Sequence, residues 1–222
     1  MLLSEIIKTC QNELEISNFK DIEIEGIDRF SQRIKNNYIY CAIDGYNIKG
    51  STAIEPAIKN GAKVVLSEID YKNDNIIVMK TKEKNIMDIY GKMLNQFYNN
   101  LPEHIIGVTG TSGKTSTVEF IRQTIELLGI KSASNGTLGI KFKDSSLKYD
   151  TLTMRETQDM YEKLYFLKNE KNINYVSMEY TSHGLDQNRG VGLLPEIGVF
   201  TNITPEHLDY HKTMEEYFNK KM

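Results

Sequence analysis

The chain has 222 residues, enough for one large domain or two small ones. Hydrophobic residues make up 40% and charged residues 26%, which is typical of a folded globular protein and excludes a disordered one. The formal net charge is −3, with no basic stripe and no acidic tail, so we do not expect a nucleic-acid partner.

The cysteines and the N-terminus indicate a cytoplasmic protein. Cys10 and Cys41 give neither a disulfide framework nor a metal-ligand spacing, and we expect both in the core. No apolar run is long enough to span a membrane, and charges interrupt residues 1–13 too early for a signal peptide. We therefore expect a cytoplasmic monomer that does not insert into membranes.

The first hundred residues predict a small α/β domain. Segments in which apolar residues alternate or run together are separated by segments with helical periodicity. Pro102 disfavours helix continuation just before it, so Leu101-Pro102 is a plausible hinge, and we place the domain at 1–101. The predicted strands are 21–27, 38–43, 63–67 and 75–79, and the predicted helices are 2–10, 51–60 and 82–99.

A strand, a small-residue loop and a helix follow one another between His104 and Gly129. The run 105–108 is β-branched, and Gly129 stands where a helix C-terminal cap belongs. The residues expected on one apolar helix face are Val118, Ile121, Ile125 and Leu128. The order strand, loop, helix is that of a phosphate-binding loop, in which backbone N–H groups at a helix N-terminus face an anion.

The loop residues suit a magnesium nucleotide. Lys114 adds a charge for the distal phosphates, and the Thr115 hydroxyl is placed to bind Mg²⁺. The alternative is a glycine-rich turn with an exposed lysine, which the joint presence of strand, loop, Lys-Thr pair and helix disfavours. The predicted ATP-binding residues are Gly110, Thr111, Ser112, Gly113, Lys114, Thr115 and Ser116.

The second half predicts a mainly parallel sheet of the phosphate-loop type. Strands alternate with helices, and ligands of such sheets bind at the carboxyl ends of the strands. Lys114, Glu179 and Asn202 all follow predicted strands, which favours one site. Glu179 can complete a Mg²⁺ site begun by Thr115, or it can simply cap a helix. Strands are predicted at 131–134, 175–178 and 197–201, a turn at 135–139, and a helix entered over 150–156 and continuing through 160–167.

Three segments together resemble the Mur ligases, the amide-forming ligases of peptidoglycan synthesis. The loop 109–115 is similar to theirs, with Ser112 in place of the usual Asn, although Val108 departs from the general Walker pattern. Segment 179–189, EYTSHGLDQNR, resembles Glu-x-Ser-Ser-His-Gly-Leu-x-Gln-x-Arg of the tripeptide synthetase branch. Segment 201–211 matches Thr-Asn-x-x-x-Asp-His-Leu-Asp-Tyr-His, except that Glu206 replaces Asp.

The resemblance implies a role for several side chains. As metal ligands it implies Thr115, Glu179 and His207, and as contacts of the UDP-linked substrate it implies Ser31, Thr153, Thr181, Gln187 and Arg189. Lys221 falls on the lysine that reacts with CO₂ to give a carbamate, so the catalytic residues are Lys114 and Lys221. A structural histidine, a turn serine and an unrestrained tail lysine are the alternatives for His207, Ser31 and Lys221. The family pattern is not kept at Phe30, Gln32, Met154 and Arg155.

The implied activity is ATP-dependent addition of an amino acid to UDP-N-acetylmuramoyl-L-alanyl-D-glutamate through an acyl phosphate, with Mg²⁺. Residues 1–101 would bind the UDP substrate, and 102–222 would be an incomplete ATP-binding domain. The C-terminal amino-acid-binding domain of the family is absent from these 222 residues, so we expect little or no activity from the chain alone.

Two other functions stay open. Truncation and the departures from the family pattern favour a non-catalytic module that binds a nucleotide or a UDP-sugar. The folylpolyglutamate synthetases are a related branch of amide ligases, but Ser182-His183-Gly184-Leu185 with Gln187 and Arg189 belongs to the muramyl branch and counts against them.

Overall fold

A computed structural model describes residues 1–45, 48–83, 85–143, 145–147 and 153–222. The chain divides into two compact units, Met1–Asn99 and Asn100–Met222, which are described separately. Residue 84 of the predicted helix 82–99 and residues 150–152 of the predicted helix entry lie outside the described residues. Among the described helices, none has the length and hydropathy that a membrane crossing requires.

The first unit is built on a five-stranded sheet in the order β1-β5-β4-β3-β2. Strands β2 to β5 are parallel, and β1 is antiparallel to β5. Parallel pairing of these short strands requires a helix or loop crossover after each one. The strands are β1 (Leu14–Ser17), β2 (Gly26–Asp28), β3 (Tyr38–Cys41), β4 (Ala62–Ser67) and β5 (Ile77–Thr81).

Helices cover both faces of this sheet. On one face, Tyr40 and Val65 pack with Ile54 and Ala57 of α2 (Ile54–Lys59). Strand side chains alternate between faces, so Cys41 belongs to the other face, where its thiol lies near Tyr90 of α3 (Ile86–Phe97). The remaining helices of this unit are α1 (Leu3–Ile6), η1 (Gln11–Glu13), η2 (Ser31–Arg33) and η3 (Gly50–Ala53).

The main error in the first unit concerns the strand predicted at 21–27. Only Gly26–Asp28 forms a strand there, while the alternating isoleucines pack without a ladder, Ile24 being fully buried. The strand Leu14–Ser17 was not predicted. Cys10 and Cys41 are both buried, as expected.

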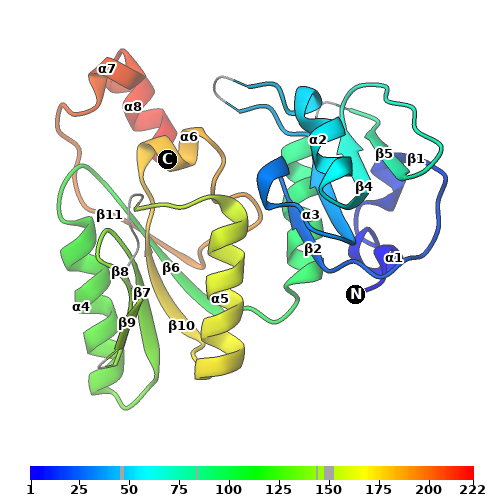
Figure 1. Cartoon of the computed structure of the whole chain (residues 1–222). Coiled ribbons are helices and arrows are strands. Elements are labelled where there is room, and N and C mark those ends of the chain that lie inside the picture. The colour runs from blue at the N-terminus through cyan, green and yellow to red at the C-terminus, as the bar shows by residue number, and fades with distance from the viewer. Residues whose placement is uncertain (46–47, 84, 144, 148–152) are drawn as a thin grey trace. The chain divides into compact units, whose positions relative to one another are not determined.

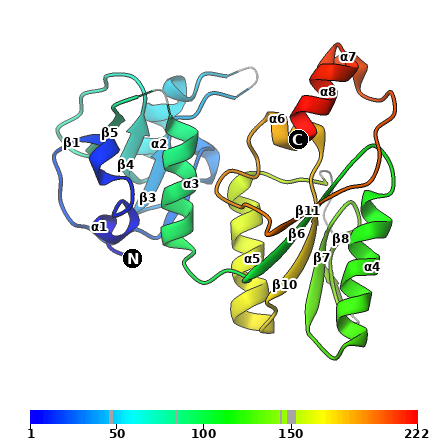
Figure 2. The ribbon, with the colours of Figure 1, turned by 180° about the vertical axis from the view of Figure 1, so that it is seen from behind.

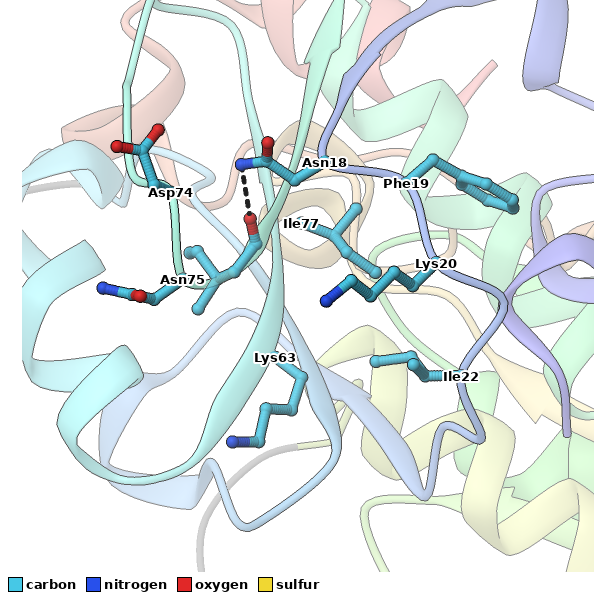
Figure 3. Close-up of a pocket in the computed structure, with 9 residues that line it drawn as sticks. Asn18, Phe19, Lys20, Ile22, Lys63, Asp74, Asn75 and Ile77 are labelled. Atoms are coloured by element: carbon cyan, nitrogen blue, oxygen red, sulfur yellow. Dashed lines mark hydrogen bonds between the residues drawn. The ribbon is translucent and has the colours of Figure 1, made fainter.

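A hollow of about 400 Å³ lies at the amino ends of β4 and β5 (Figure 3). Lys20 and Lys63 line it, and the Asn18 side-chain amide donates to the Ile76 carbonyl at its wall (3.2 Å). Ligands of parallel sheets bind at the carboxyl ends of the strands, so this hollow lies at the opposite edge of the sheet.

The second unit contains a six-stranded sheet in the order β11-β6-β10-β7-β8-β9. The first four strands are parallel, and the β8 and β9 hairpin additions are antiparallel. This mainly parallel α/β architecture confirms the predicted fold class. The strands are β6 (His104–Thr109), β7 (Ser132–Gly136), β8 (Gly139–Phe142), β9 (Ser145–Leu147), β10 (Tyr175–Glu179) and β11 (Ile197–Phe200).

Helices α4 and α5 lie on opposite faces of this sheet, as both views show (Figures 1 and 2). On α4, Val118 is buried as predicted, but Leu128 is 72% exposed, and Arg122 is buried instead, paired with Glu119 and Glu126. The helices are α4 (Lys114–Leu127), α5 (Thr157–Lys171), α6 (Ser182–Asp186), α7 (Leu208–His211) and α8 (Met214–Lys221).

Candidate ATP and substrate site

The loop between β6 and α4 offers free backbone donors. Gly113 adopts φ 84°, and α4 begins at Lys114. Within the described part of the chain, the N–H groups of Gly113, Lys114 and Thr115 have no acceptor. The first N–H groups of a helix lack partners inside it and carry the positive end of the helix dipole. They are therefore available to an anion such as a phosphate.

The Lys114 side chain folds back onto its own loop. Its ammonium donates to the Gly110 carbonyl (2.9 Å) and to the Thr111 carbonyl (2.6 Å). Gly110 has φ 140°, and a Cβ there would lie 2.0 Å from Thr201 Oγ1. Glycine is therefore required at 110, because the backbone conformation and the close approach both exclude a side chain.

Thr201 and Asn202, which follow β11, form hydrogen bonds with the loop between β6 and α4. The Asn202 carbonyl accepts from the Thr111 N–H (2.9 Å), and its side chain exchanges two hydrogen bonds with the Ser112 backbone (3.0 and 3.1 Å). Thr201 Oγ1 donates to the Ser112 carbonyl (2.7 Å). Asn202 therefore holds the loop, and the Thr111 and Ser112 N–H groups are already engaged.

Glu179 ends β10 beside the loop. Its register partner on β6 is Val108, two residues before Gly110. The carboxylate is 2% exposed, and its oxygens accept from the Thr137 N–H (2.9 Å) and the Thr137 hydroxyl (3.2 Å). Gly136 makes room for it, since a Cβ there would lie 2.1 Å from Glu179 Oε1.

His207 lies among aromatic side chains close to the loop. It has φ 56°, and its ring centroid is 4.7 Å from that of His183 and 6.2 Å from that of Tyr217. Burial, followed by the charge of His207, lowers the pKa of His183. His183 belongs to α6, which begins three residues after Glu179, so these contacts tie the second and third motif segments together.

Among the described residues, no group of three His, Cys, Asp or Glu side chains is arranged for a metal ion. Thr115 and Glu179 supply oxygen atoms, which Mg²⁺ prefers, and His207 adds one nitrogen. A cation held by these three side chains would need phosphate oxygens or water to complete an octahedral shell. By the chemistry of their donor atoms alone, these residues would hold a metal that arrives with a nucleotide.

Lys221 reaches the same loop from α8. Its ammonium donates to the Gly110 carbonyl (2.8 Å) and lies 4.7 Å from the Tyr217 ring centroid. Lys221 as a whole is only 7% exposed. Burial, followed by the nearby Lys114 charge, lowers the pKa of Lys221 from 10.5 to about 8. The alternative of an unrestrained tail lysine is wrong for this structure. A lysine with a lowered pKa is a better nucleophile near neutral pH.

The predicted substrate residues of the second unit take part in separate sets of hydrogen bonds. Arg189 donates to the Gln187 side chain (2.6 Å) and to the Met154 carbonyl (3.0 Å). Thr153 Oγ1 lies 3.0 Å from Thr137 Oγ1, which connects it to the Glu179 carboxylate. Thr181 instead caps α6, accepting from the Gly184 N–H (3.1 Å).

Ser31 belongs to the first unit and is only 6% exposed. Its carbonyl accepts from the Asn60 side chain (2.8 Å). Positions 30 and 32 carry Phe and Gln, and the nearby charges are Asp28, which is buried, and Arg33, whose guanidinium lies 4.0 Å from the Asp28 carboxylate. The family pattern gave no signal for this pair, because both residues lie outside the compared positions.

The sequence assigned no role in the site to Thr137 or Tyr217. Thr137 supplies both donors to Glu179, and the Tyr217 hydroxyl lies 3.1 Å from Thr111 Oγ1. Tyr217 and Thr111 are 106 residues apart in sequence.

Comparison with known proteins places this geometry in one family. Residues 108–222 match the model of the Mur ligase middle domain. The chain is 34% identical to the UDP-N-acetylmuramoyl-L-alanyl-D-glutamate–2,6-diaminopimelate ligase of Clostridium tetani, over all of this chain and 46% of that protein. The ligase of the same name from Brucella melitensis biotype 1 is 33% identical, over 95% of this chain and 43% of the relative.

A solved structure of a UDP-N-acetylmuramoyl-L-alanyl-D-glutamate–2,6-diaminopimelate ligase has the same fold. It superposes with a TM-score of 0.74 at 28% identity, covering 89% of this chain and 40% of that one. The chain therefore spans less than half the length of the relatives that it matches.

Proposed function

The chain belongs to the Mur ligase family, and we propose that it contributes the nucleotide-binding and UDP-substrate-binding parts of an ATP-dependent amide ligase. The reaction adds the third amino acid to UDP-N-acetylmuramoyl-L-alanyl-D-glutamate in peptidoglycan synthesis, in the cytoplasm. The relatives are named for 2,6-diaminopimelate, so this is the amino acid that we assign.

The observation that carries this proposal is the N-terminus of α4, with its free N–H groups beside Lys114. These donors would receive the phosphates of ATP, and Lys114 would leave the Gly110 carbonyl to reach the distal phosphate. The γ-phosphoryl group then passes to the substrate carboxylate, and the amine of the amino acid displaces phosphate from the acyl phosphate. Positioning and charge neutralisation supply the catalysis, and no protein nucleophile is needed.

Thr115, Glu179 and His207 are the residues that we assign to Mg²⁺, which would neutralise charge on the transferring phosphoryl group. Lys221 is proposed to carry a carbamate, formed when its unprotonated amine attacks CO₂ and loses a proton. The lowered pKa of Lys221 supports this assignment, since more of its amine is unprotonated near pH 8. Arg189 and Gln187 would position the substrate through hydrogen bonds, because the guanidinium fork matches a carboxylate.

The test is a phosphate-release assay on the purified chain with Mg-ATP, UDP-N-acetylmuramoyl-L-alanyl-D-glutamate and diaminopimelate, combined with calorimetry of ATP binding. We expect ATP binding that the Lys114→Met variant abolishes, with little or no phosphate release, because the chain spans less than half the length of the ligases that it matches. The matched control is Lys59→Met, an exposed lysine of the first unit. Failure of the wild-type chain to bind ATP would refute the proposal.

The second candidate is a nucleotide-binding module without ligase activity. The burial of Ser31 favours it, because a serine that is 6% exposed offers little access to a UDP group. The module predicts ATP binding that is unaffected by the UDP substrate, with no phosphate release. The ligase proposal predicts instead that the UDP substrate and ATP bind together and that each changes the affinity for the other.

A further inference from the structure

Tyr217 lies between the phosphate-binding loop and Lys221. Its side chain is fully buried, and its hydroxyl is 3.1 Å from Thr111 Oγ1 in the loop. Lys221 follows four residues later on α8, so the two side chains share one helix face. The Lys221 ammonium lies 4.7 Å from the Tyr217 ring centroid, within the range of a cation–π contact.

Tyr217 contacts Thr111 of the loop through its hydroxyl and His211 of α7 through its ring. Thr111 Oγ1 accepts from the Thr204 N–H (3.0 Å), so the loop side chain that meets Tyr217 also holds the segment after β11. On its other side the Tyr217 ring meets the His211 ring, at 5.4 Å between centroids. The two ring nitrogens of His211 are buried without a partner in the described residues, so His211 supports the ring by packing.

We propose that Tyr217 is a positioning residue that couples the conformation of the phosphate-binding loop to the placement of the Lys221 side chain. Its hydroxyl acts on the loop through Thr111, and its ring holds the Lys221 ammonium. The inference rests on the proposed function in one respect: the proposed carbamate on Lys221 is the reason why the position of this side chain matters.

The Gly110 carbonyl is shared by two ammonium groups, so the position of one can affect the other. Lys114 and Lys221 both donate to this oxygen in the structure. A phosphate in the loop draws Lys114 away, so the Gly110 carbonyl and the Tyr217 ring are then the two contacts that keep Lys221 in place. Any shift of Thr111 that accompanies phosphate binding is transmitted to Lys221 through the Tyr217 side chain.

The test reads the position of Lys221 by NMR of the whole chain with ¹³C-labelled lysine, following the Cε–Hε signal that the Lys221→Arg variant removes. The ring of Tyr217 shifts this signal away from those of exposed lysines. Tyr217→Phe removes only the hydroxyl contact, whereas Thr111→Val also removes the contacts of Thr111 with Thr204. We expect each to move the Lys221 signal, and the double variant to move it no further than Thr111→Val alone.

Additive shifts in the double variant, or no shift in either single variant, would overturn the coupling, because independent sites add. This cycle needs no nucleotide, so it remains decisive even if the chain does not bind ATP and the proposed function fails. With Mg-ATP, we expect the wild-type signal to move and the Tyr217→Phe signal to stay; equal movement would also overturn the inference. Phe218→Leu is the matched control, since that ring points toward Phe200 (6.0 Å between centroids).

Discussion

Lys114 and Lys221 donate hydrogen bonds to the same backbone oxygen, the Gly110 carbonyl, over 2.9 Å and 2.8 Å. Two ammonium groups that meet at one acceptor repel each other, and the repulsion is strong where water is excluded. An anion at the N-terminus of α4 would accept from Lys114 and relieve the repulsion.

We predict that Lys114→Met raises the pKa of Lys221. Lys114 is the second cause of the lowered pKa, after burial, so its removal moves the pKa back toward 10.5 without restoring it fully. An NMR titration of the Lys221 Cε signal measures the change. The exposed-lysine variant Lys59→Met should leave the titration where it is in the wild type, and an unchanged titration in Lys114→Met would show that Lys114 lies farther away in solution.

The lowered pKa of Lys221 also predicts how stability depends on pH. Below about pH 8 the amine is protonated in the folded and unfolded chains, so the cost of burying the ammonium is present in full. Between pH 8 and 10.5 the unfolded chain binds more protons, so the free energy of unfolding rises with pH. We expect the stability of the wild type relative to Lys221→Met to rise over this interval in urea titrations.

The neighbouring Lys220 provides the control for this experiment. Its hydrogen bond to Asp186 raises its pKa above 10.5, so the stability that it contributes stays constant up to that pH and is lost only above it. The wild type should therefore keep a constant advantage over Lys220→Met between pH 8 and 10.5. A parallel rise for both variants would trace the effect to the general charge of the chain.

Local patterns predicted the parts of the fold that depend on local physics. The glycine loop, the Lys-Thr pair and the Gly129 cap, which has φ 79°, lie where the sequence places them. The strand Leu14–Ser17 was missed because its stability comes from antiparallel pairing with β5, more than sixty residues away. Leu128 was placed on the inner face of α4 by periodicity alone, whereas burial of Arg122 depends on its two glutamate partners.

In the candidate site, too, the sequence predicted the features set by local motifs and not those set by distant contacts. The motifs gave the side chains that follow strand ends, since the carboxyl ends of parallel strands meet at one edge. They gave no indication that Asn202 takes up loop N–H groups or that Tyr217 reaches Thr111. Such contacts join residues far apart in sequence, and only the packed tertiary structure defines them.

The N-cap of α8 is predicted to matter for Tyr217 and Lys221. Thr213 Oγ1 accepts from the Glu216 N–H (3.1 Å), which satisfies one of the unpaired donors of the first turn. Thr213→Ala should cost about 1 kcal/mol of stability and increase hydrogen exchange at the Tyr217 amide. Thr124→Ala, at an exposed position inside α4, is the control and should be neutral or stabilising. Equal exchange in both variants would mean that packing alone holds α8.

Gly136 leaves space for the Glu179 carboxylate. Gly136→Ala would place a methyl group 2.1 Å from Glu179 Oε1, and the carboxylate already accepts two hydrogen bonds from Thr137. The carboxylate must therefore move, which breaks its hydrogen bonds in a buried setting. We expect a loss of roughly 1–3 kcal/mol in the free energy of unfolding, together with weaker Mg-dependent ATP binding.

Gly198→Ala separates this crowding from the general effect of removing a strand glycine. Gly198 lies in β11, and a Cβ there meets nothing within 4 Å in the described structure. Alanine should be neutral or slightly stabilising at that position, because it restricts the unfolded chain without a clash. Urea unfolding of both variants measures the difference. A loss at 198 equal to that at 136 would show that the Glu179 carboxylate is not the group that requires glycine.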